Sequence, residues 1–359
     1  MTSFRRGLGF GLMLAVIAQM GTSAAFQAPA ASRSGKAPPK REIKRSHLQA
    51  PASLSDQIAA LGRAFDGKAG IAVISLRDGW EADWNARALF PQQSCSKLWV
   101  SITALDLVDR GQLSLDQQVP LSRGDMTLFH QPLGDRILAG SIHSIKLGDL
   151  MFAAITQSDN TANDKLLWSI GGPPAVRAMI ARKGLGAIRF YNGERALQSK
   201  IAGLTWDPSY SVGNGFMQAR SALPMTRRQA AFDRYVRNPY DGASPHAIAN
   251  ALAALKAGEL LSPQSTDRLL STMGQTKTGG LRVKAALAAG WEWNHKTGTG
   301  QELNGHIAGI NDIGLLTAPD GSVYAVAIMT MPNHSDGSAQ ELMRNVATTI
   351  QAFHATHPI

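Results

Sequence analysis

The sequence predicts an α+β fold, because candidate strands lie near both ends of the chain and helical patterns fill the middle. Residues 70–76 and 80–84 are apolar runs separated by Arg77-Asp78-Gly79, a strong hairpin signal. Three more apolar or alternating runs lie near the C-terminus, at 291–296, 312–317 and 323–331. We therefore expect one antiparallel sheet built from both chain ends, flanked by helices, with an all-helical insert between them.

The helical parts are long. A first helix is expected over residues 54–65, after Ser53, and a last one over residues 338–354. Between the two groups of strands, residues 94–273 are largely helical in pattern. Residues 51–359 are long enough for one large domain or two intertwined ones.

Two helices of the middle region have marked starts. Ser244-Pro245 and Ser262-Pro263 each combine an N-capping serine with a proline suited to the first helical turn. Gly258 and Gly274 suit the ends of these helices. Pro319-Asp320-Gly321 predicts the turn of the last hairpin.

The N-terminal residues read as an export leader and a linker. Residues 1–25 combine two arginines, a short apolar run and a small-residue cleavage site, as in a cleavable signal peptide. An uncleaved N-terminal anchor is the alternative. Residues 26–50 are rich in Ala, Pro and basic residues and lack apolar periodicity, which predicts a linker. The mature domain, residues 51–359, is then periplasmic or secreted, without stable membrane insertion after cleavage.

The positive charge is concentrated in that leader and linker. Residues 1–50 hold eight Lys or Arg and one Glu, a net +7 of the chain's +10, which leaves +3 for the domain. A basic nucleic-acid-binding face on the domain is therefore not supported. The linker is a solvated tether or a segment that touches an anionic surface.

Cysteine and histidine usage gives little sign of crosslinks or metal sites. Cys95 is the only cysteine, so no intrachain disulfide can form, and we expect a buried thiol. No metal-ligand cluster stands out beyond His354 and His357, in a tail that we expect to be frayed. We therefore expect no metal and no cofactor.

The first candidate site motif is Ser94-Cys95-Ser96-Lys97. Ser94 and Lys97 are three residues apart at the start of an apolar helical run, so they should share one face of the first turn. A serine hydroxyl needs a neighbouring base to become a nucleophile, and a lysine one turn along can supply it. The alternative is an N-capping serine followed by a solvated lysine.

Two further motifs follow in the chain. Ser158-Asp159-Asn160 lies between two apolar helical stretches, where a serine can pass a proton and an asparagine can bind a substrate amide. Residues 296–300, Lys-Thr-Gly-Thr-Gly, end a predicted strand and offer a cation for a carboxylate beside small residues. Taken singly, the first would be a capping turn and the second an ordinary glycine-containing turn.

Together, the three motifs resemble those of the serine β-lactamase and penicillin-binding-protein superfamily, over about residues 53–357. The resemblance implies a β-lactamase/transpeptidase-like fold, a monomer and a small-molecule β-lactam substrate. It implies attack by Ser94, proton transfer by Lys97 and Ser158, and an oxyanion hole from the N–H groups of Ser94 and Thr299. The implied substrate-binding residues are Asn160, Lys296, Thr297, Gly298 and Thr299.

A fourth feature points to one branch of this superfamily. Residues 194–198, Glu-Arg-Ala-Leu-Gln, resemble the Glu-x-x-Leu-Asn segment of class A β-lactamases, in which the glutamate activates the deacylating water. The resemblance therefore assigns that role to Glu194. Residues 241–245 resemble the end of the omega loop that carries this glutamate, and residues 311–314 resemble a strand of some class A enzymes.

The sequence departs from this family at four places. Gln198 replaces the usual water-holding asparagine, and Asn192 replaces an arginine that usually pairs with the aspartate closing the omega loop. His306 stands where some relatives have a carboxylate-binding arginine. Residues 199–240 form a much longer segment than the usual loop, and we expect this extended omega loop to pack beside the active site and restrict substrate entry.

The function implied is that of an exported class A β-lactamase-like hydrolase, acylated at Ser94 and deacylated with the help of Glu194. One alternative is a D-alanyl-D-alanine carboxypeptidase or an esterase of the same fold, which does not need Glu194. Another is a non-catalytic wall- or ligand-binding module, although such a binder would not need the proton-transfer side chains.

Overall fold

The computed structural model describes residues 48–357. The expected leader, residues 1–25, and most of the expected linker lie outside this range. Leu48 and Gln49, which the linker prediction includes, instead form the short strand β1 (Leu48–Gln49), parallel to β3 (Trp80–Trp84). The ordered fold therefore begins slightly before the predicted boundary at residue 51.

A six-stranded sheet joins the two ends of the chain, as predicted. Its strand order is β1-β3-β2-β10-β9-β6, and all pairs except β1–β3 are antiparallel. The larger strands are β2 (Gly67–Ser75), β6 (Glu292–Thr299), β9 (Ile310–Thr317) and β10 (Val323–Pro332). The first strand group thus pairs directly with the last strand, β2 with β10, and the predicted α+β fold is confirmed.

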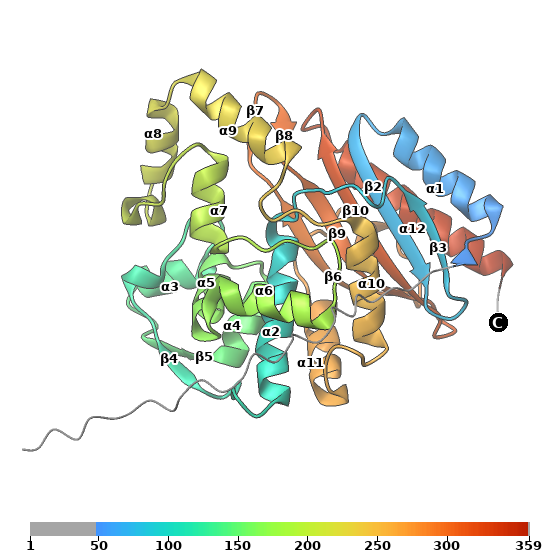
Figure 1. Cartoon of the computed structure of the whole chain (residues 1–359), viewed down its shortest axis with the longest axis horizontal. Coiled ribbons are helices and arrows are strands. Elements are labelled where there is room, and N and C mark those ends of the chain that lie inside the picture. Colours follow the sequence, from blue (N-terminus) through green and yellow to red (C-terminus); the bar gives the residue numbers. More distant parts are fainter. Residues whose placement is uncertain (1–47, 358–359) are drawn as a thin grey trace, which may run out of the picture. The chain divides into compact units, whose positions relative to one another are not determined.

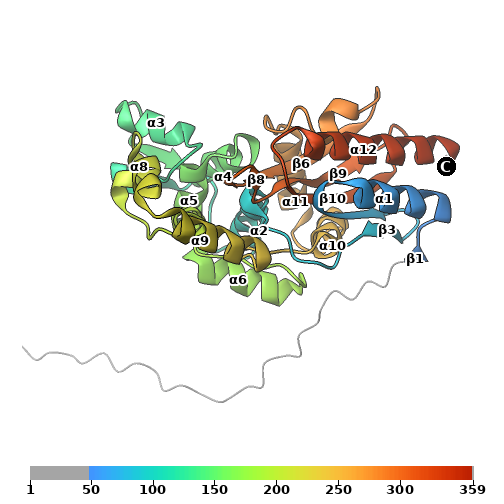
Figure 2. The same cartoon turned by 90° about the horizontal axis from the view of Figure 1, so that it is seen from above.

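Alternate residues of the central strands pack on opposite faces of the sheet. In β2, Ile71 and Val73 join a cluster with helices α1 (Ala52–Ala64) and α12 (Ser338–Thr356). Ala72 and Ile74 join the main core on the other face, which α10 (Pro245–Lys256) covers. Figures 1 and 2 show α1 and α12 side by side, with α10 across the sheet from them. A strand buried on both faces reads as a continuous apolar run, as this one does.

The helical insert packs around α2 (Lys97–Asp109), whose residues 97–106 are all buried. Such a helix has no polar face and must lie inside the domain. Helices α4 (Leu147–Thr156), α5 (Asn160–Ser169), α6 (Gly172–Lys183) and α11 (Pro263–Gly274) pack against it. Helices α3 (Pro132–Leu138) and α7 (Gly193–Ile201) pack on α5. A two-stranded ribbon, β4 (Gln118–Pro120) with β5 (Ser144–Lys146), lies at the edge of this insert.

The predicted capping serines are present. The Ser244 hydroxyl accepts a hydrogen bond from the Ala247 N–H at the start of α10, and Ser262 caps α11 in the same way. Gly258 has a φ of +73°, as a residue just past a helix end requires. Gly274 is instead the last helical residue, where a Cβ would lie 2.9 Å from the Asn294 amide nitrogen, so close packing explains this glycine.

The segment 199–240, predicted as an extended omega loop, contains two helices. These are α8 (Gly215–Ala222) and α9 (Met225–Arg237), preceded by a 3₁₀ turn at Pro208–Ser211. A small hairpin of β7 (Glu302–Leu303) and β8 (His306–Ile307), which the sequence analysis did not identify, follows β6. Figure 1 shows α8 and α9 above α7.

The C-terminal helix is not frayed at His354, contrary to the expectation. His354 is buried, and its ring nitrogen Nδ1 lies 2.9 Å from the Tyr324 hydroxyl. Its position in α12 makes it part of the packing against the sheet. Among residues 48–357, no helix is both long and apolar enough to cross a membrane.

Candidate active site

Ser94 lies in a 3₁₀ turn, Gln93–Ser96, that leads directly into α2. It is the one residue between 91 and 100 that is not fully buried. The turn is held from outside, because the Asn311 side-chain amide donates hydrogen bonds to the carbonyl groups of Pro91 and Gln92, at 2.8 and 3.1 Å. The hydroxyl of Ser94 therefore faces open space from a rigid support.

Lys97 contacts Ser94 as the sequence spacing predicts. Its ammonium donates to the Ser94 hydroxyl at 2.6 Å, to the Asn160 side-chain oxygen at 2.8 Å and to the Glu194 carboxylate at 2.6 Å. The side chain has no exposed surface. An ammonium has three hydrogens, and each here has an oxygen acceptor. Lys97 thus lies between the candidate nucleophile and a carboxylate, in contact with both.

Glu194 is buried in the first turn of α7 rather than exposed on a loop. Asp164 caps this helix: its carboxylate accepts the backbone N–H groups of Glu194 at 2.9 Å and Arg195 at 3.3 Å. Burial, and next the nearby Glu194 charge, raise the pKa of Asp164 to about 6. The Gln198 amide donates to the second oxygen of Glu194 at 3.2 Å. The Glu194 carboxylate is therefore held by an ammonium on one oxygen and an amide on the other.

Ser158 and Lys296 form a second hydroxyl–lysine pair. Ser158 has a φ of +60° in the turn between α4 and α5, and the Lys296 ammonium donates to its hydroxyl at 2.9 Å. Lys296 has no exposed surface. Burial, and next the charge of Lys97, lower the pKa of Lys296 to about 7. Asp159, between Ser158 and Asn160, caps α5 and does not face the site.

Asn160 is less free than the sequence analysis expected. Its oxygen accepts from Lys97, and its amide nitrogen donates to the Leu128 carbonyl at 2.9 Å. Only the second hydrogen of that nitrogen is left for a ligand. Asn160 therefore orients Lys97 in addition to any role in substrate binding.

The end of β6 lies against the turn that carries Ser94. A Cβ at Gly298 would lie 2.4 Å from the Gln92 carbonyl oxygen, so only glycine permits this approach. Gly298 was predicted to bind substrate, and the structure gives it this packing role. Its neighbours face outward: the Thr297 hydroxyl lies 2.6 Å from that of Thr278, and the Thr299 hydroxyl accepts from Arg282 at 2.6 Å.

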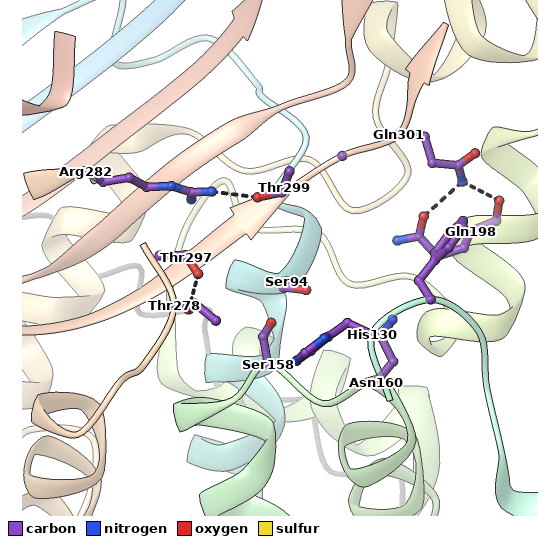
Figure 3. A pocket seen from close by; sticks show the side chains of 12 residues that line it. Ser94, His130, Ser158, Asn160, Gln198, Thr278, Arg282, Thr297, Thr299 and Gln301 are labelled. Carbon is purple, nitrogen blue, oxygen red and sulfur yellow. Dashed lines mark hydrogen bonds between the residues drawn. The ribbon is translucent and has the colours of Figure 1, made fainter. Parts of the chain in front are cut away.

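These groups surround one pocket of about 340 Å³ (Figure 3). Five predicted residues line it: Ser94, Ser158, Asn160, Thr297 and Thr299. The other four, Lys97, Glu194, Lys296 and Gly298, lie behind this lining. The pocket also contains residues that the sequence analysis missed: Phe129, His130, Thr278, Arg282, Gly300 and Gln301. All nine predicted residues thus meet at or directly behind one pocket.

Arg282 lines this pocket, and His306 does not. Its guanidinium is 8% exposed and donates to the Gly298 and Asn311 carbonyl groups as well as to Thr299. His306 is exposed on β8 and lines a different pocket, beside α9. His306, at the position where the resemblance implies a carboxylate-binding arginine in some relatives, therefore does not line the active-site pocket. The sequence signal for Arg282 was weak, because it lies in a coil 14 residues before Lys296.

Tyr235 of the insert, rather than an arginine, pairs with Asp241 at the end of the omega loop. Its hydroxyl donates to Asp241 at 2.9 Å and accepts from the Gln93 amide at 2.7 Å, while the Gln93 backbone N–H donates to the other oxygen of Asp241 at 2.8 Å. Gln93 has a φ of +54° directly before Ser94. Asn192, where the family has the arginine, bonds Arg177 instead. Burial raises the pKa of Asp241 to about 6.

The insert also supports the wall of the pocket. The ring of Phe216 in α8 packs edge-on against that of Phe129, with ring centroids 4.9 Å apart. The Gln131 amide donates to the Ser211 carbonyl at 2.8 Å. The expected packing of the insert beside the site is therefore present. Within residues 48–357, no group of three or more His, Cys, Asp or Glu side chains is arranged to hold a metal ion.

Comparison with known proteins gives a consistent result. Residues 53–353 match the model of the beta-lactamase enzyme family. Beta-lactamase CTX-M-97 of Escherichia coli is 24% identical over 305 residues, which cover 85% of this chain and 90% of that protein. A beta-lactamase of Mycobacterium tuberculosis is 27% identical over 283 residues, 79% of each chain.

Solved structures show the same fold. A beta-lactamase from Chitinophaga pinensis has a TM-score of 0.67 and 26% identity, over 83% of this chain and 97% of that one. An ancestral class A beta-lactamase has a TM-score of 0.67 and 26% identity, over 84% and 99%. These matches confirm the resemblance predicted from the motifs. With the family model spanning nearly all the described residues, the chain belongs to the beta-lactamase enzyme family and is a class A serine β-lactamase by its relatives.

Proposed function

We propose that this protein hydrolyses β-lactams in two steps, through an acyl-enzyme on Ser94. The contact that carries the proposal is the one around Lys97, whose ammonium lies 2.6 Å from both the Ser94 hydroxyl and the Glu194 carboxylate. One cation thereby links a nucleophile at the pocket surface to a buried base. Family membership and the similarity to enzymes named β-lactamases support the same reaction.

In the first step, the Ser94 oxygen attacks the strained lactam carbonyl. Its proton is taken by Lys97, or by Glu194 through a water molecule. The oxyanion would be stabilised by the backbone N–H groups of Ser94 and Thr299, which belong to the 3₁₀ turn and the end of β6. Gly298, which lets β6 lie directly on that turn, supports this proposal.

Opening of the lactam needs a proton on the leaving nitrogen. Ser158 is suited to deliver it, because its hydroxyl lines the pocket and Lys296 donates to the same hydroxyl at 2.9 Å. A hydroxyl that receives a hydrogen bond from an ammonium gives up its own proton more readily. The positive φ of Ser158 aims this side chain from a turn rather than from a helix.

In the second step, a water molecule attacks the ester. Glu194 would take a proton from this water, and Gln198 would orient the carboxylate through its bond to the second oxygen. The substitution of glutamine for the family's asparagine at position 198 is thus compatible with deacylation, since its amide reaches Glu194. A carboxypeptidase or esterase of the same fold would not need this arrangement.

The carboxylate of the substrate would lie at the end of the pocket formed by Thr278, Arg282 and Thr297. The guanidinium is always protonated, and Lys296 lies behind the same wall. Two hydroxyls and two cations are the groups that a carboxylate binds best. The acyl substituent would then extend toward the other end of the pocket.

We also propose export of a monomer. The support for export is the leader-like composition of residues 1–25, and the support for a monomer is the resemblance to the family. N-terminal sequencing of the protein recovered outside the cytoplasm should begin near residue 26. Recovery with Met1 in the membrane fraction would indicate an uncleaved anchor instead.

The experiment for the reaction is a hydrolysis assay with benzylpenicillin, comparing the wild-type protein with Ser94→Ala and Ser101→Ala. Ser101 is a matched control, because it is a buried serine on α2, the helix that follows the Ser94 turn, and its hydroxyl has no hydrogen-bond partner among the described residues. We expect hydrolysis by the wild-type protein and Ser101→Ala and none by Ser94→Ala. Equal hydrolysis by all three would remove Ser94 from the mechanism.

A further inference from the structure

Two glutamine side chains meet at one end of the active-site pocket. The Gln301 amide donates to the backbone carbonyl of Gln198 at 2.8 Å and to its side-chain oxygen at 3.0 Å. Both residues line the pocket, and they are 8% and 6% exposed. Gln301 follows β6, and Gln198 lies in α7, so this contact joins the two walls of the pocket. We call it the glutamine bridge.

Each side of the bridge is fixed. The Gln301 carbonyl accepts a hydrogen bond from the Ala308 N–H at 2.9 Å, which holds its backbone in the β7–β8 region. The Gln198 amide nitrogen donates to Glu194 at 3.2 Å and to Gln93 at 3.3 Å. The oxygen of Gln198 must therefore point toward Gln301. An asparagine at position 198 would be shorter by one methylene, about 1.5 Å, and could not make all these contacts from the same backbone.

The bridge lies at the end of the pocket opposite the cations. In Figure 3, Arg282, Thr278 and Thr297 are on one side of Ser94, and Gln198 and Gln301 are on the other. A bicyclic β-lactam carries its carboxylate and its acylamino substituent on opposite sides of the reactive carbonyl. With the carboxylate at the cationic end, the acyl substituent faces the bridge.

We propose that the glutamine bridge determines substrate specificity, favouring β-lactams with small acyl substituents over those with bulky, branched ones. This inference rests on the proposed function. A bulky group must displace the bridge, which leaves the buried side-chain oxygen of Gln198 without its donor and its backbone carbonyl with only the 3.4 Å bond from the Ala202 N–H. The side-chain oxygen of Gln301 is buried and already lacks a partner among the described residues, so the opened side chain gains no ready bond there.

The contacts of Gln301 and Gln198 decide which substitutions test the bridge. Gln301→Ala removes the bridge and its bulk but keeps the bond from Gln198 to Glu194, whereas a change at Gln198 would disturb both. Gln301→Glu has nearly the same shape, but its carboxylate cannot donate to the two oxygens and is repelled by them. Gln229→Ala is the control, because this glutamine lies on α9, bonds Asn304 and lines a different pocket.

The measurement uses two boronic acids that form reversible adducts with an active-site serine: acetamidomethylboronic acid and its diphenylacetamido analogue. The readout is the ratio of their dissociation constants. In Gln301→Ala we expect this ratio to shift toward the bulky compound by about ten-fold, with a smaller shift in the same direction for Gln301→Glu. Gln229→Ala should keep the wild-type ratio. An unchanged ratio in Gln301→Ala, with the acetamido compound still binding, would overturn the proposal.

Hydrolysis of benzylpenicillin by the wild-type protein is measured in parallel. If the wild-type protein hydrolyses benzylpenicillin but Gln301→Ala keeps the wild-type ratio of dissociation constants, the proposed function stands and the role of the bridge in specificity is wrong. If the ratio shifts in Gln301→Ala but the wild-type protein does not hydrolyse benzylpenicillin, the bridge selects ligands and the proposed function is wrong, since boronic acids need only the serine. If neither boronic acid binds the wild-type protein, Ser94 is not an accessible nucleophile, and the bridge has no role in specificity.

Discussion

Lys97 shows how one buried side chain depends on its partners. An ion pair with both members buried is stable only when the remaining hydrogen-bonding groups are satisfied. Lys97 meets this requirement with Ser94, Asn160 and Glu194, all within 2.8 Å. Removing any of these acceptors leaves an unsatisfied hydrogen on a charged group. The catalytic arrangement and the stability of this region are therefore linked.

Arg282 and His306 give a direct test of the carboxylate site. Arg282→Gln should raise the KM for benzylpenicillin about ten-fold, because the pocket loses the guanidinium in its lining. His306→Gln, at the position where some relatives have an arginine, should leave the KM unchanged, because His306 lines a different pocket. The measurement is steady-state kinetics on benzylpenicillin and on its methyl ester.

The ester separates substrate binding from folding effects. It has no carboxylate charge, so Arg282→Gln should alter its KM far less than that of the acid. An equal effect on acid and ester would indicate that Arg282 acts only through the structure of β6. A KM change in His306→Gln alone would mean that the carboxylate lies near His306 and not near Arg282.

Individual site residues could be predicted where the signal was local. Ser94 and Lys97 share a helical turn, and Ser158 and Asn160 lie in one tight turn, so spacing was sufficient. Glu194 needed the family resemblance, because it meets Lys97 from 97 residues further along the chain. Arg282 and Gln301 have no local pattern, and only the path of β6 and its flanking coils brings them into the pocket.

At the scale of elements, the insert of residues 199–240 supplies support to the site from α9. Tyr235 is fully buried and bonds both Asp241 and Gln93. The Gln198 amide in turn donates to the Gln93 side-chain oxygen and to Glu194. A chain of hydrogen bonds therefore runs from the insert to the candidate base. This support replaces the arginine that the sequence lacks at Asn192.

Tyr235→Phe tests this support. The change leaves one oxygen of buried Asp241 without its donor, so the free energy of unfolding should fall by about 1–3 kcal/mol. The acyl-enzyme should also persist several-fold longer, because Glu194 is less well oriented, while acylation changes less. Urea unfolding and the decay rate of the benzylpenicillin adduct are the two measurements.

Tyr240→Phe is the matched control for Tyr235→Phe. The Tyr240 ring packs against that of Tyr235 with centroids 5.8 Å apart, and its hydroxyl makes no hydrogen bond with the other described residues. It should behave as the wild-type protein in both measurements. If the two variants have equal effects on adduct decay, the hydroxyl of Tyr235 is not a positioning group.

The larger elements could be predicted because their patterns are strong. The strand at Trp80–Trp84 matches its expected bounds, and the two serine–proline helix starts are both present. The small hairpin of β7 and β8 was missed, because strands of two residues have no periodicity to detect. The individual helices of the insert could not be located for another reason: α9 is mostly polar, and only Ala231, Phe232 and Tyr235 are buried.

At the scale of the whole molecule, buried carboxylates influence stability. Asp164 and Asp241 are both fully buried, and burial raises the pKa of each to about 6. Each therefore binds a proton more tightly in the folded chain than in the unfolded one. Acids with lowered pKa values, such as Asp106 and Asp125, lose their contribution only below their ordinary pKa of 3.8.

The pH dependence of stability follows from these shifts. Between about pH 4 and about pH 6, the folded state holds more protons at Asp164 and Asp241, so stability should fall as pH rises, by on the order of 2–3 kcal/mol per group at most. Asp164→Asn removes one of these groups and should make the slope shallower. Urea unfolding at several pH values checks this. A slope that is equal in the variant would mean that Asp164 ionises normally in the folded protein.

The central claim is that Glu194 releases an acyl group from Ser94, and the intact mass of the protein during reaction with excess benzylpenicillin tests it most directly. The wild-type protein should consume the lactam with little adduct. Glu194→Gln keeps the size of the side chain but not its basicity, so one equivalent of adduct should accumulate, with deacylation slower by about 10²–10⁴-fold. Unmodified Glu194→Gln protein that turns over as fast as the wild type would contradict the account.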